Sequence, residues 1–191
     1  MAHKFDVKNK HKLDNEERRK MLPPEKTLTS LGLHEGDIVA DIGCGIGYFS
    51  IPAAEIVGKN GKVFALDILS EMLQEVEIKI KENNIFNIET ILTEENNLKL
   101  EEGKITFAFI ANVLHETEEL ERFLGEVKKI ISIKGKIAIV DWQKIKSEFG
   151  PPVDHRLDKL ELINILAKSG FSDISNIDIG DNFYGITAVK N

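Results

Sequence analysis

The stretch "DIVADIGCGIGYFS", residues 37–50, joins a run of apolar residues to three glycines within five positions. The apolar run predicts a strand that is buried on both faces. The glycines predict a tight turn in which the backbone approaches a small molecule closely. Because ligands of open α/β sheets bind outside the carboxyl ends of the strands, the fold and the ligand site are both expected to be organised around this stretch.

Apolar runs of the same kind recur along the chain, at residues 62–67, 87–92, 105–113 and 135–142. Helix-sized segments separate them, best seen over 117–132, where Thr117 is expected to cap a helix with a clear 3.6-residue period. Near the end, 171–179 and 182–191 are joined only by a short turn, which predicts a hairpin. We therefore expect an α/β fold: a doubly wound, mostly parallel seven-stranded sheet with the last strand antiparallel and helices on both faces.

The 191 residues are expected to form a single domain, 1–191. Residues 1–35 are predicted to be an N-terminal helical cap or lid, with Asp14 as an N-cap, and residues 36–191 the α/β core. The basic residues before Met21 are expected either on a solvated helix face or on a lid that faces a substrate. Arg156, which follows a Pro-Pro pair, is expected in a solvated loop or as an anchor for an anionic substrate.

Charge and cysteine content exclude several classes of function. The 25 Lys and Arg against 32 Asp and Glu give a net charge of −7, which repels a phosphate backbone and argues against nucleic acid as a partner. There is no apolar run of the roughly 18 residues that a membrane span needs, so no membrane partner is expected. The single cysteine, Cys44, forms no internal disulfide and suits a cytoplasmic protein. No metal-ligand spacing occurs, and the oligomeric state stays open.

The predicted strand ends carry an acidic rim. It comprises Asp41, Asp67, Glu94 and Asp141, together with Asn112 and His115. A dinucleotide site needs G-x-G-x-x-G, but here the glycines are Gly43, Gly45 and Gly47, and Tyr48 takes the place of the third glycine. Asp41 would also repel a pyrophosphate. The rim favours a cationic ligand such as S-adenosyl-L-methionine, with Asp67 placed to hold ribose hydroxyls. An NAD(P)-linked reductase and a non-catalytic cofactor-binding module are the alternatives.

"DIGCGIG" with "LDI" downstream resembles the first two motifs of the class I S-adenosylmethionine-dependent methyltransferases, and the likeness spans about residues 36–142. That family has a Rossmann-like fold with a reversed last strand. The resemblance implies that the glycine loop binds the methionine part, Ile68 the adenine, and Glu94 or Glu95 the adenine amino group. The implied residues of the loop and of the fourth strand are Asp41, Gly43, Cys44, Gly45 and Gly47, with Ala111 and Asn112 at the methionine end.

More locally, "HKFD", "KLDNEERRKMLPPE" and "EFGPPVDHR" are similar to small bacterial and archaeal methyltransferases related to those of ubiquinone and menaquinone biosynthesis. The resemblance implies in-line transfer of a methyl group to a small-molecule acceptor. His115 is a candidate catalytic base, or a positioning residue, at the mouth of the site. Asp141 is a second catalytic candidate, which would bind an acceptor hydroxyl or amine or take up its proton.

Overall fold

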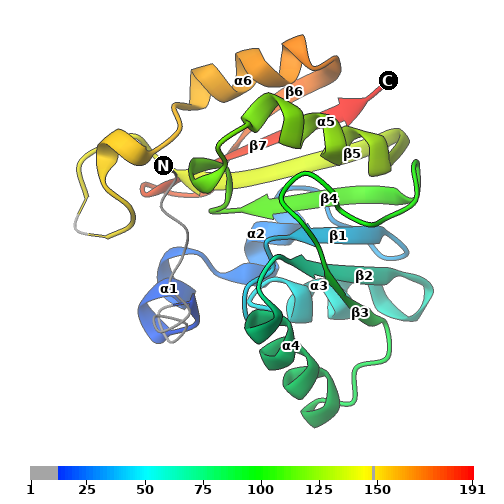
Figure 1. Ribbon diagram of the computed structural model, residues 1–191. Coiled ribbons are helices and arrows are strands. Elements are labelled where there is room, and N and C mark those ends of the chain that lie inside the picture. Colours follow the sequence, from blue (N-terminus) through cyan, green and yellow to red (C-terminus); the bar gives the residue numbers. More distant parts are fainter. Residues whose placement is uncertain (1–12, 148) are drawn as a thin grey trace.

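A computed structural model describes residues 13–147 and 149–191. The first part of the predicted cap, residues 1–12, lies outside the described residues. The described chain forms a seven-stranded sheet in the order β3-β2-β1-β4-β5-β7-β6 (Figure 1). Its strands are β1 (Ile38–Ile42), β2 (Lys62–Asp67), β3 (Ile88–Leu92), β4 (Ile105–Ala111), β5 (Ile131–Trp142), β6 (Phe171–Asp178) and β7 (Phe183–Lys190).

The predicted topology is confirmed. Strands β1 to β5 pair in parallel, and β7 is antiparallel to both of its neighbours, β5 and β6. The last strand of the chain is therefore the reversed one, and it is inserted beside β5 while β6 forms the edge of the sheet. The nearly continuous apolar runs are explained by burial on both faces, since residues 137–140 of β5 are all inaccessible to solvent.

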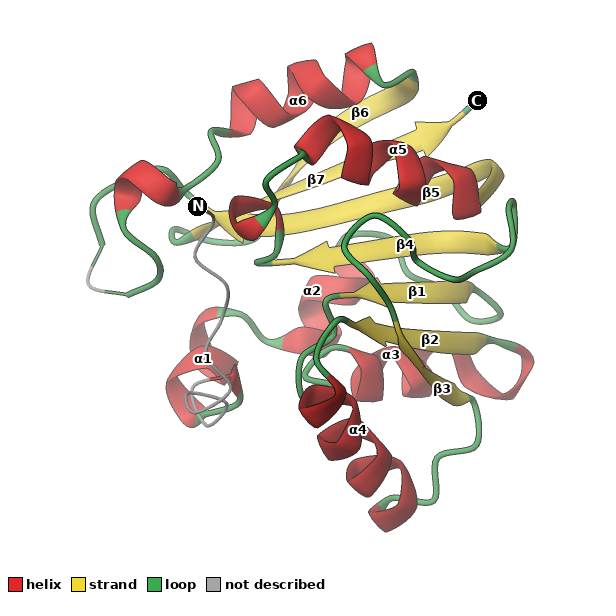
Figure 2. Cartoon of the chain, viewed as in Figure 1, coloured by secondary structure: helices red, strands yellow, loops and turns green. Residues whose placement is uncertain are grey.

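Helices cover both faces of the sheet (Figure 2). Apolar residues of α5 and α6 pack on one face, and those of α2, α3 and α4 on the other. The helices are α1 (Glu16–Met21), α2 (Pro24–Ser30), α3 (Ser50–Val57), α4 (Ser70–Glu82), α5 (Leu120–Ile130) and α6 (Lys159–Lys168). Short 3-10 turns are η2 (Gly58–Asn60), η3 (Leu114–Glu116) and η4 (Val153–His155).

Two predicted helix caps are wrong. Thr117 is the C-cap of the turn η3, and α5 starts three residues later, because residues 118–119 form bends between the turn and the helix. At α1 the cap is Asn15, whose side chain accepts a hydrogen bond from the Arg18 N–H at 2.8 Å. Asp14 instead forms a bidentate pair with Arg19. Asp and Asn are both good N-caps, and here the pairing of Asp14 with Arg19 leaves Asn15 to cap the helix.

A crevice lies beside β1, at the point where the order in which strands are added to the sheet changes side. From β1 the chain proceeds to β2 and β3 on one side and then returns to β4 on the other. The loops after β1 and β4 therefore diverge at the carboxyl ends of adjacent strands, which is the place where open α/β sheets bind ligands. The glycine turn of residues 43–47 lies at this point.

Candidate active site

The glycine turn after β1 is fixed to the end of β2 by backbone hydrogen bonds. The N–H groups of Gly43 and Cys44 both donate to the Leu66 carbonyl, at 2.8 and 2.9 Å. Gly43 has φ +72°, and a Cβ added there would lie 2.4 Å from a methyl of Val113 on the loop after β4. Only glycine therefore allows the turn to lie this close to the β4 loop.

Asp67, the last residue of β2, binds the same turn. Its Oδ2 accepts the Gly45 N–H at 2.9 Å, and its Oδ1 accepts the Leu69 N–H at 2.9 Å. Burial raises the pKa of Asp67, and these backbone hydrogen bonds oppose the rise. A carboxylate has about four lone-pair sites, so Asp67 can still accept a hydrogen bond from a ligand hydroxyl.

Asp41 lies deeper, near the end of β1, and is 3% exposed. The Ser50 hydroxyl at the start of α3 donates to its Oδ2 at 2.5 Å. Burial raises the pKa of Asp41 to about 7; the Ser50 hydrogen bond opposes this, the charge of Asp67 adds to it, and the charge of Arg18 opposes it. Two buried carboxyls near one another are stabilised by a cation placed between or beside them.

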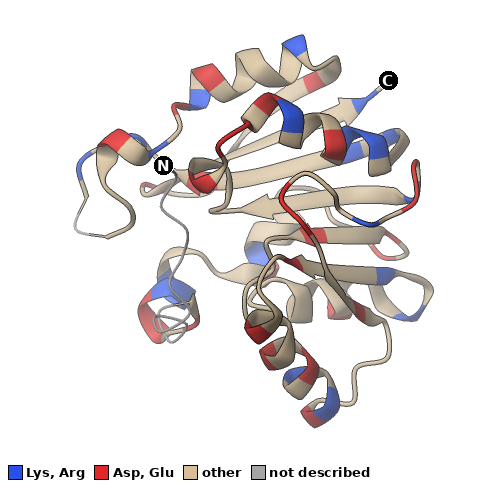
Figure 3. Ribbon diagram, in the orientation of Figure 1, with Lys and Arg blue, Asp and Glu red and all other residues tan. Residues whose placement is uncertain are grey.

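A pocket opens above these groups, and acidic side chains dominate its charged lining. It includes five acids, Asp41, Asp67, Glu94, Glu95 and Glu116, and one base, Arg18. Its apolar wall contains Ile42, Ile46, Phe49, Ile68, Leu69, Met72, Leu98, Val113 and Phe123. Figure 3 shows the acidic residues on the loops that follow β3 and precede α5. These loops are in contact, since Glu95 accepts the Glu118 N–H at 3.3 Å.

The pocket wall also carries an acceptor that needs a ligand donor. Asn112 follows β4 in a left-handed conformation, with φ +58°. Its Oδ1 is buried and has no hydrogen-bond partner among the described residues. A buried polar atom without a partner is costly, so this oxygen suits a ligand N–H. With the glycine turn and the two aspartates, the wall fits an α-amino acid that bears a positive charge.

The residues predicted to bind a cofactor converge on this pocket, with one exception. Ten of them line it: Asp41, Gly43, Cys44, Gly45, Asp67, Ile68, Glu94, Glu95, Ala111 and Asn112. Gly47 lies outside, against Val76 of α4, where an added Cβ would be 3.2 Å from a methyl group. Burial raises the pKa of the Cys44 thiol, so this residue contributes its backbone and not a thiolate.

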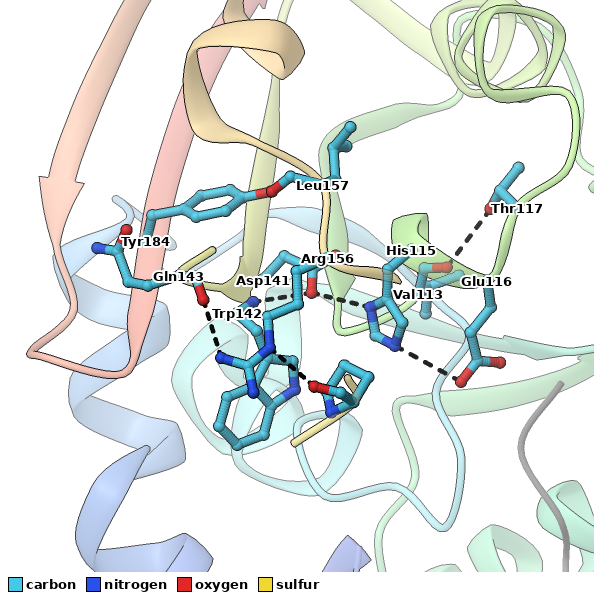
Figure 4. Close-up of polar contacts among 11 residues, drawn as sticks. Val113, His115, Glu116, Thr117, Asp141, Trp142, Gln143, Arg156, Leu157 and Tyr184 are labelled. Carbon is cyan, nitrogen blue, oxygen red and sulfur yellow. Dashed lines mark hydrogen bonds and ion pairs between the residues drawn. The ribbon is translucent and has the colours of Figure 1, made fainter. Parts of the chain in front are cut away.

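His115 and Asp141 form a hydrogen-bonded pair beside the pocket. His115 Nδ1 lies 2.9 Å from Asp141 Oδ1, which also accepts the Trp142 N–H at 2.8 Å. His115 Nε2 faces Glu116, 3.8 Å away, and Glu116 lines the pocket (Figure 4). Burial lowers the pKa of His115, but the hydrogen bond and charge of Asp141 and the charge of Glu116 outweigh it, so the pKa is raised. The chemistry available here is proton transfer near neutral pH.

Sequence analysis did not single out Arg18, among the basic residues before Met21, as a pocket residue. Its guanidinium lies over the Tyr48 ring, 4.5 Å from the centroid, and it lines the pocket. Tyr48 is itself 5% exposed and donates its hydroxyl to the Leu22 carbonyl. The side chain that fills the place of a dinucleotide-type glycine thus supports a cation from α1. The tyrosine was the available signal, because Tyr faces attract guanidinium groups.

Residues 13–147 and 149–191 lack two kinds of feature. They contain no cluster of three or more His, Cys, Asp or Glu side chains arranged to hold a metal ion. They also contain no helix that is both long enough and apolar enough to cross a membrane.

Comparisons with known proteins agree with the geometry. A family model described as a methyltransferase domain matches residues 33–170. The demethylmenaquinone methyltransferase of Geobacillus sp. (strain WCH70) is 27% identical over 124 residues, which are 65% of this chain and 53% of that protein. The chain spans about half the length of the curated relatives that it matches.

Solved structures extend the likeness to nearly the whole chain. The crystal structure of a SAM dependent methyltransferase from Aquifex aeolicus has a TM-score of 0.93 and 32% identity, covering 98% of this chain and 100% of that one. A putative type 11 methyltransferase from Sulfolobus solfataricus has the same fold, with a TM-score of 0.74 and 22% identity over 90% of this chain and 94% of that one.

Proposed function

This chain belongs to the methyltransferase-domain family, and from that premise we propose that it transfers a methyl group from S-adenosyl-L-methionine to a small-molecule acceptor. The observation that carries the proposal is the set of buried carboxyls, Asp41 and Asp67, at adjacent strand ends around a glycine turn. The Aquifex aeolicus protein, which matches over its full length, is described as SAM dependent. When bound, the sulfonium supplies a methyl group that is activated for displacement.

Each part of the cofactor has a counterpart in the pocket wall. Asp67 would accept hydrogen bonds from the ribose hydroxyls, and Ile68, which is 40% exposed, would cover the adenine. Glu94 or Glu95 would accept from the adenine amino group. The turn of Gly43, Cys44 and Gly45 would contact the methionine part with its backbone. The ammonium would lie near Asp41 and the unpaired oxygen of Asn112, beside Ala111.

Arg18 gives the pocket its one positive charge among the described lining residues. We assign it to the carboxylate of the methionine part, because a guanidinium binds a carboxylate in a charge-assisted hydrogen bond. The Tyr48 ring packs against the Arg18 guanidinium and holds this side chain in place. The N-terminal cap would then take part in cofactor binding, which gives a role to α1, a helix with no buried residue of its own.

His115 would accept a proton from the acceptor at Nε2. Asp141 fixes the orientation of the ring through Nδ1 and stabilises its charged form. Carbon and oxygen acceptors need such a base, whereas positioning alone brings a large part of the rate gain for any acceptor.

The names of the curated relatives make demethylmenaquinone the first acceptor to test, and the apolar wall of the pocket suits such a molecule. The lone cysteine favours a cytoplasmic location.

Isothermal titration calorimetry with S-adenosylhomocysteine tests the cofactor assignment. We expect binding by the wild type and an affinity at least tenfold lower in Asp67→Asn, since the amide replaces one carboxylate oxygen by a donor. Asp178→Asn is the matched control, because Asp178 is on β6 at the opposite edge of the sheet and should leave binding unchanged. An absence of heat at millimolar ligand would remove the proposal.

A further inference from the structure

Arg156 holds together the loop that follows β5. The residue is 3% exposed, and its guanidinium donates five hydrogen bonds. The acceptors are the carbonyls of Gln143, Ile145, Phe149 and Pro151 and the hydroxyl of Ser147, all at 2.8 to 2.9 Å. The prediction that Arg156 lies in a solvated loop or binds an anionic acceptor is therefore wrong, because every donor of the fork is already used within the loop.

The same loop is fixed against Trp142, the residue next to Asp141. Arg156 lies 5.3 Å from the centroid of the indole, and Phe183 packs against the ring at 4.3 Å. Gly150 has φ +88°, and a Cβ added there would lie 2.7 Å from the indole. Since the Trp142 N–H donates to Asp141, the loop and the carboxylate are joined through one residue.

The charge of Arg156 is buried among neutral oxygens. Among the described residues, its five hydrogen-bond partners are carbonyls or a hydroxyl, and the carboxylate on which its charge acts is that of Asp141. A buried carboxylate and a buried guanidinium each carry a high cost unless an opposite charge is near. Arg156 and Asp141 supply each other with that charge, without a direct bond between them being needed.

We propose that Arg156 is a positioning residue for the His115–Asp141 pair: it fixes residues 143–147 and 149–156 against Trp142 and balances the charge of Asp141, so that His115 does not have to carry a proton permanently to do so. Its significance for methyl transfer rests on the proposed function. The electrostatic part concerns the free protein and is testable without any ligand.

The charged groups around His115 determine the sign of the effect. Asp141 on β5 and Glu116 on η3 stabilise the protonated ring and raise its pKa, while burial and Arg156 lower it. Tyr184 on β7 faces Asp141, and burial together with the charge of Asp141 raises its pKa, so it stays neutral. Loss of the Arg156 charge must therefore make His115 more basic.

Two variants separate the charge of Arg156 from its hydrogen bonds. Arg156→Gln keeps donors to the loop but removes the charge, and Arg156→Lys keeps the charge but loses the planar fork. Lys168→Met, on the exposed last turn of α6, is the control for removing a positive charge elsewhere. The measurement is an NMR titration of the imidazole signals of the five histidines, with His115 assigned from a His115→Asn spectrum.

We expect about a threefold higher proton affinity of His115 in Arg156→Gln, or about 0.5 in pKa, and no such change in Arg156→Lys or Lys168→Met. We also expect faster amide exchange in the loop of Arg156→Lys, which keeps the test informative if Arg156→Gln does not fold. An unchanged His115 titration in folded Arg156→Gln, or an equally large change in Arg156→Lys, would overturn the proposal. Failure of the wild type to bind S-adenosylhomocysteine would instead reject the proposed function and leave this result standing.

Discussion

Replacement of Asp41 by Asn is expected to stabilise the protein while it weakens cofactor binding. Burial raises the pKa of Asp41 from an ordinary value of 3.8 to about 7, so the folded state resists ionisation of this group. Each pKa unit corresponds to about 1.4 kcal/mol, and the rise corresponds to roughly 4 kcal/mol of destabilisation once the group is fully ionised. An amide has the same shape and no charge, so Asp41→Asn escapes this cost.

The pH dependence gives the sign of the effect. Below pH 3.8 the carboxyl is protonated in both states and costs nothing. As the pH rises toward 7, the unfolded state ionises first and is favoured, so the stability of the wild type falls. Roughly 3 kcal/mol of the loss accrues between pH 5 and pH 8. Above pH 8 the difference from Asp41→Asn is constant.

Urea denaturation at pH 5, 6, 7 and 8 measures this difference directly. We expect the free energy of unfolding of Asp41→Asn to exceed that of the wild type by an amount that grows with pH. Ser50→Ala is the companion variant: without the hydroxyl that stabilises the charged form, the pKa of Asp41 rises further and the loss deepens. A difference between Asp41→Asn and the wild type that stays constant from pH 5 to pH 8 would refute the reasoning.

Two other changes test the pocket wall. Gly43→Ala should cost roughly 2 kcal/mol of stability and abolish S-adenosylhomocysteine binding, because its Cβ would meet Val113 at 2.4 Å in a left-handed conformation. Gly36→Ala is the control, since Gly36 also has a positive φ but has nothing within 4 Å of the added Cβ. It should lower the melting temperature and leave the binding affinity measured by calorimetry unchanged. Arg18→Met should lower that affinity about tenfold through loss of a charge-assisted hydrogen bond, whereas Lys20→Met on the exposed face of α1 should not; equal effects of the two would contradict the assignment of Arg18 to the carboxylate.

The fold was predictable because each of its determinants is local. Continuous apolar runs such as 105–113 indicate strands buried on both faces, and the short link at residues 180–181 leaves no room for a crossover helix. The convergence of the acidic strand ends on one pocket was predictable for a related reason. Asp41 and Asp67 end successive parallel strands, and parallel strands bring their carboxyl ends to one edge without further information.

Arg18 and Arg156 were not predictable, and the reason is physical. Each lies in a charged or Pro-rich segment that alone indicates solvent exposure, but partners that only the folded chain supplies bury Arg156 and half-bury Arg18. An arginine can leave water when a set of oxygens or an aromatic face replaces the interactions that its guanidinium makes with water. Such a set is assembled from segments with no common sequence pattern, as with the four carbonyls and one hydroxyl around Arg156. Arginines held beside an acidic site are therefore where a structure adds most to what the sequence of this protein predicts.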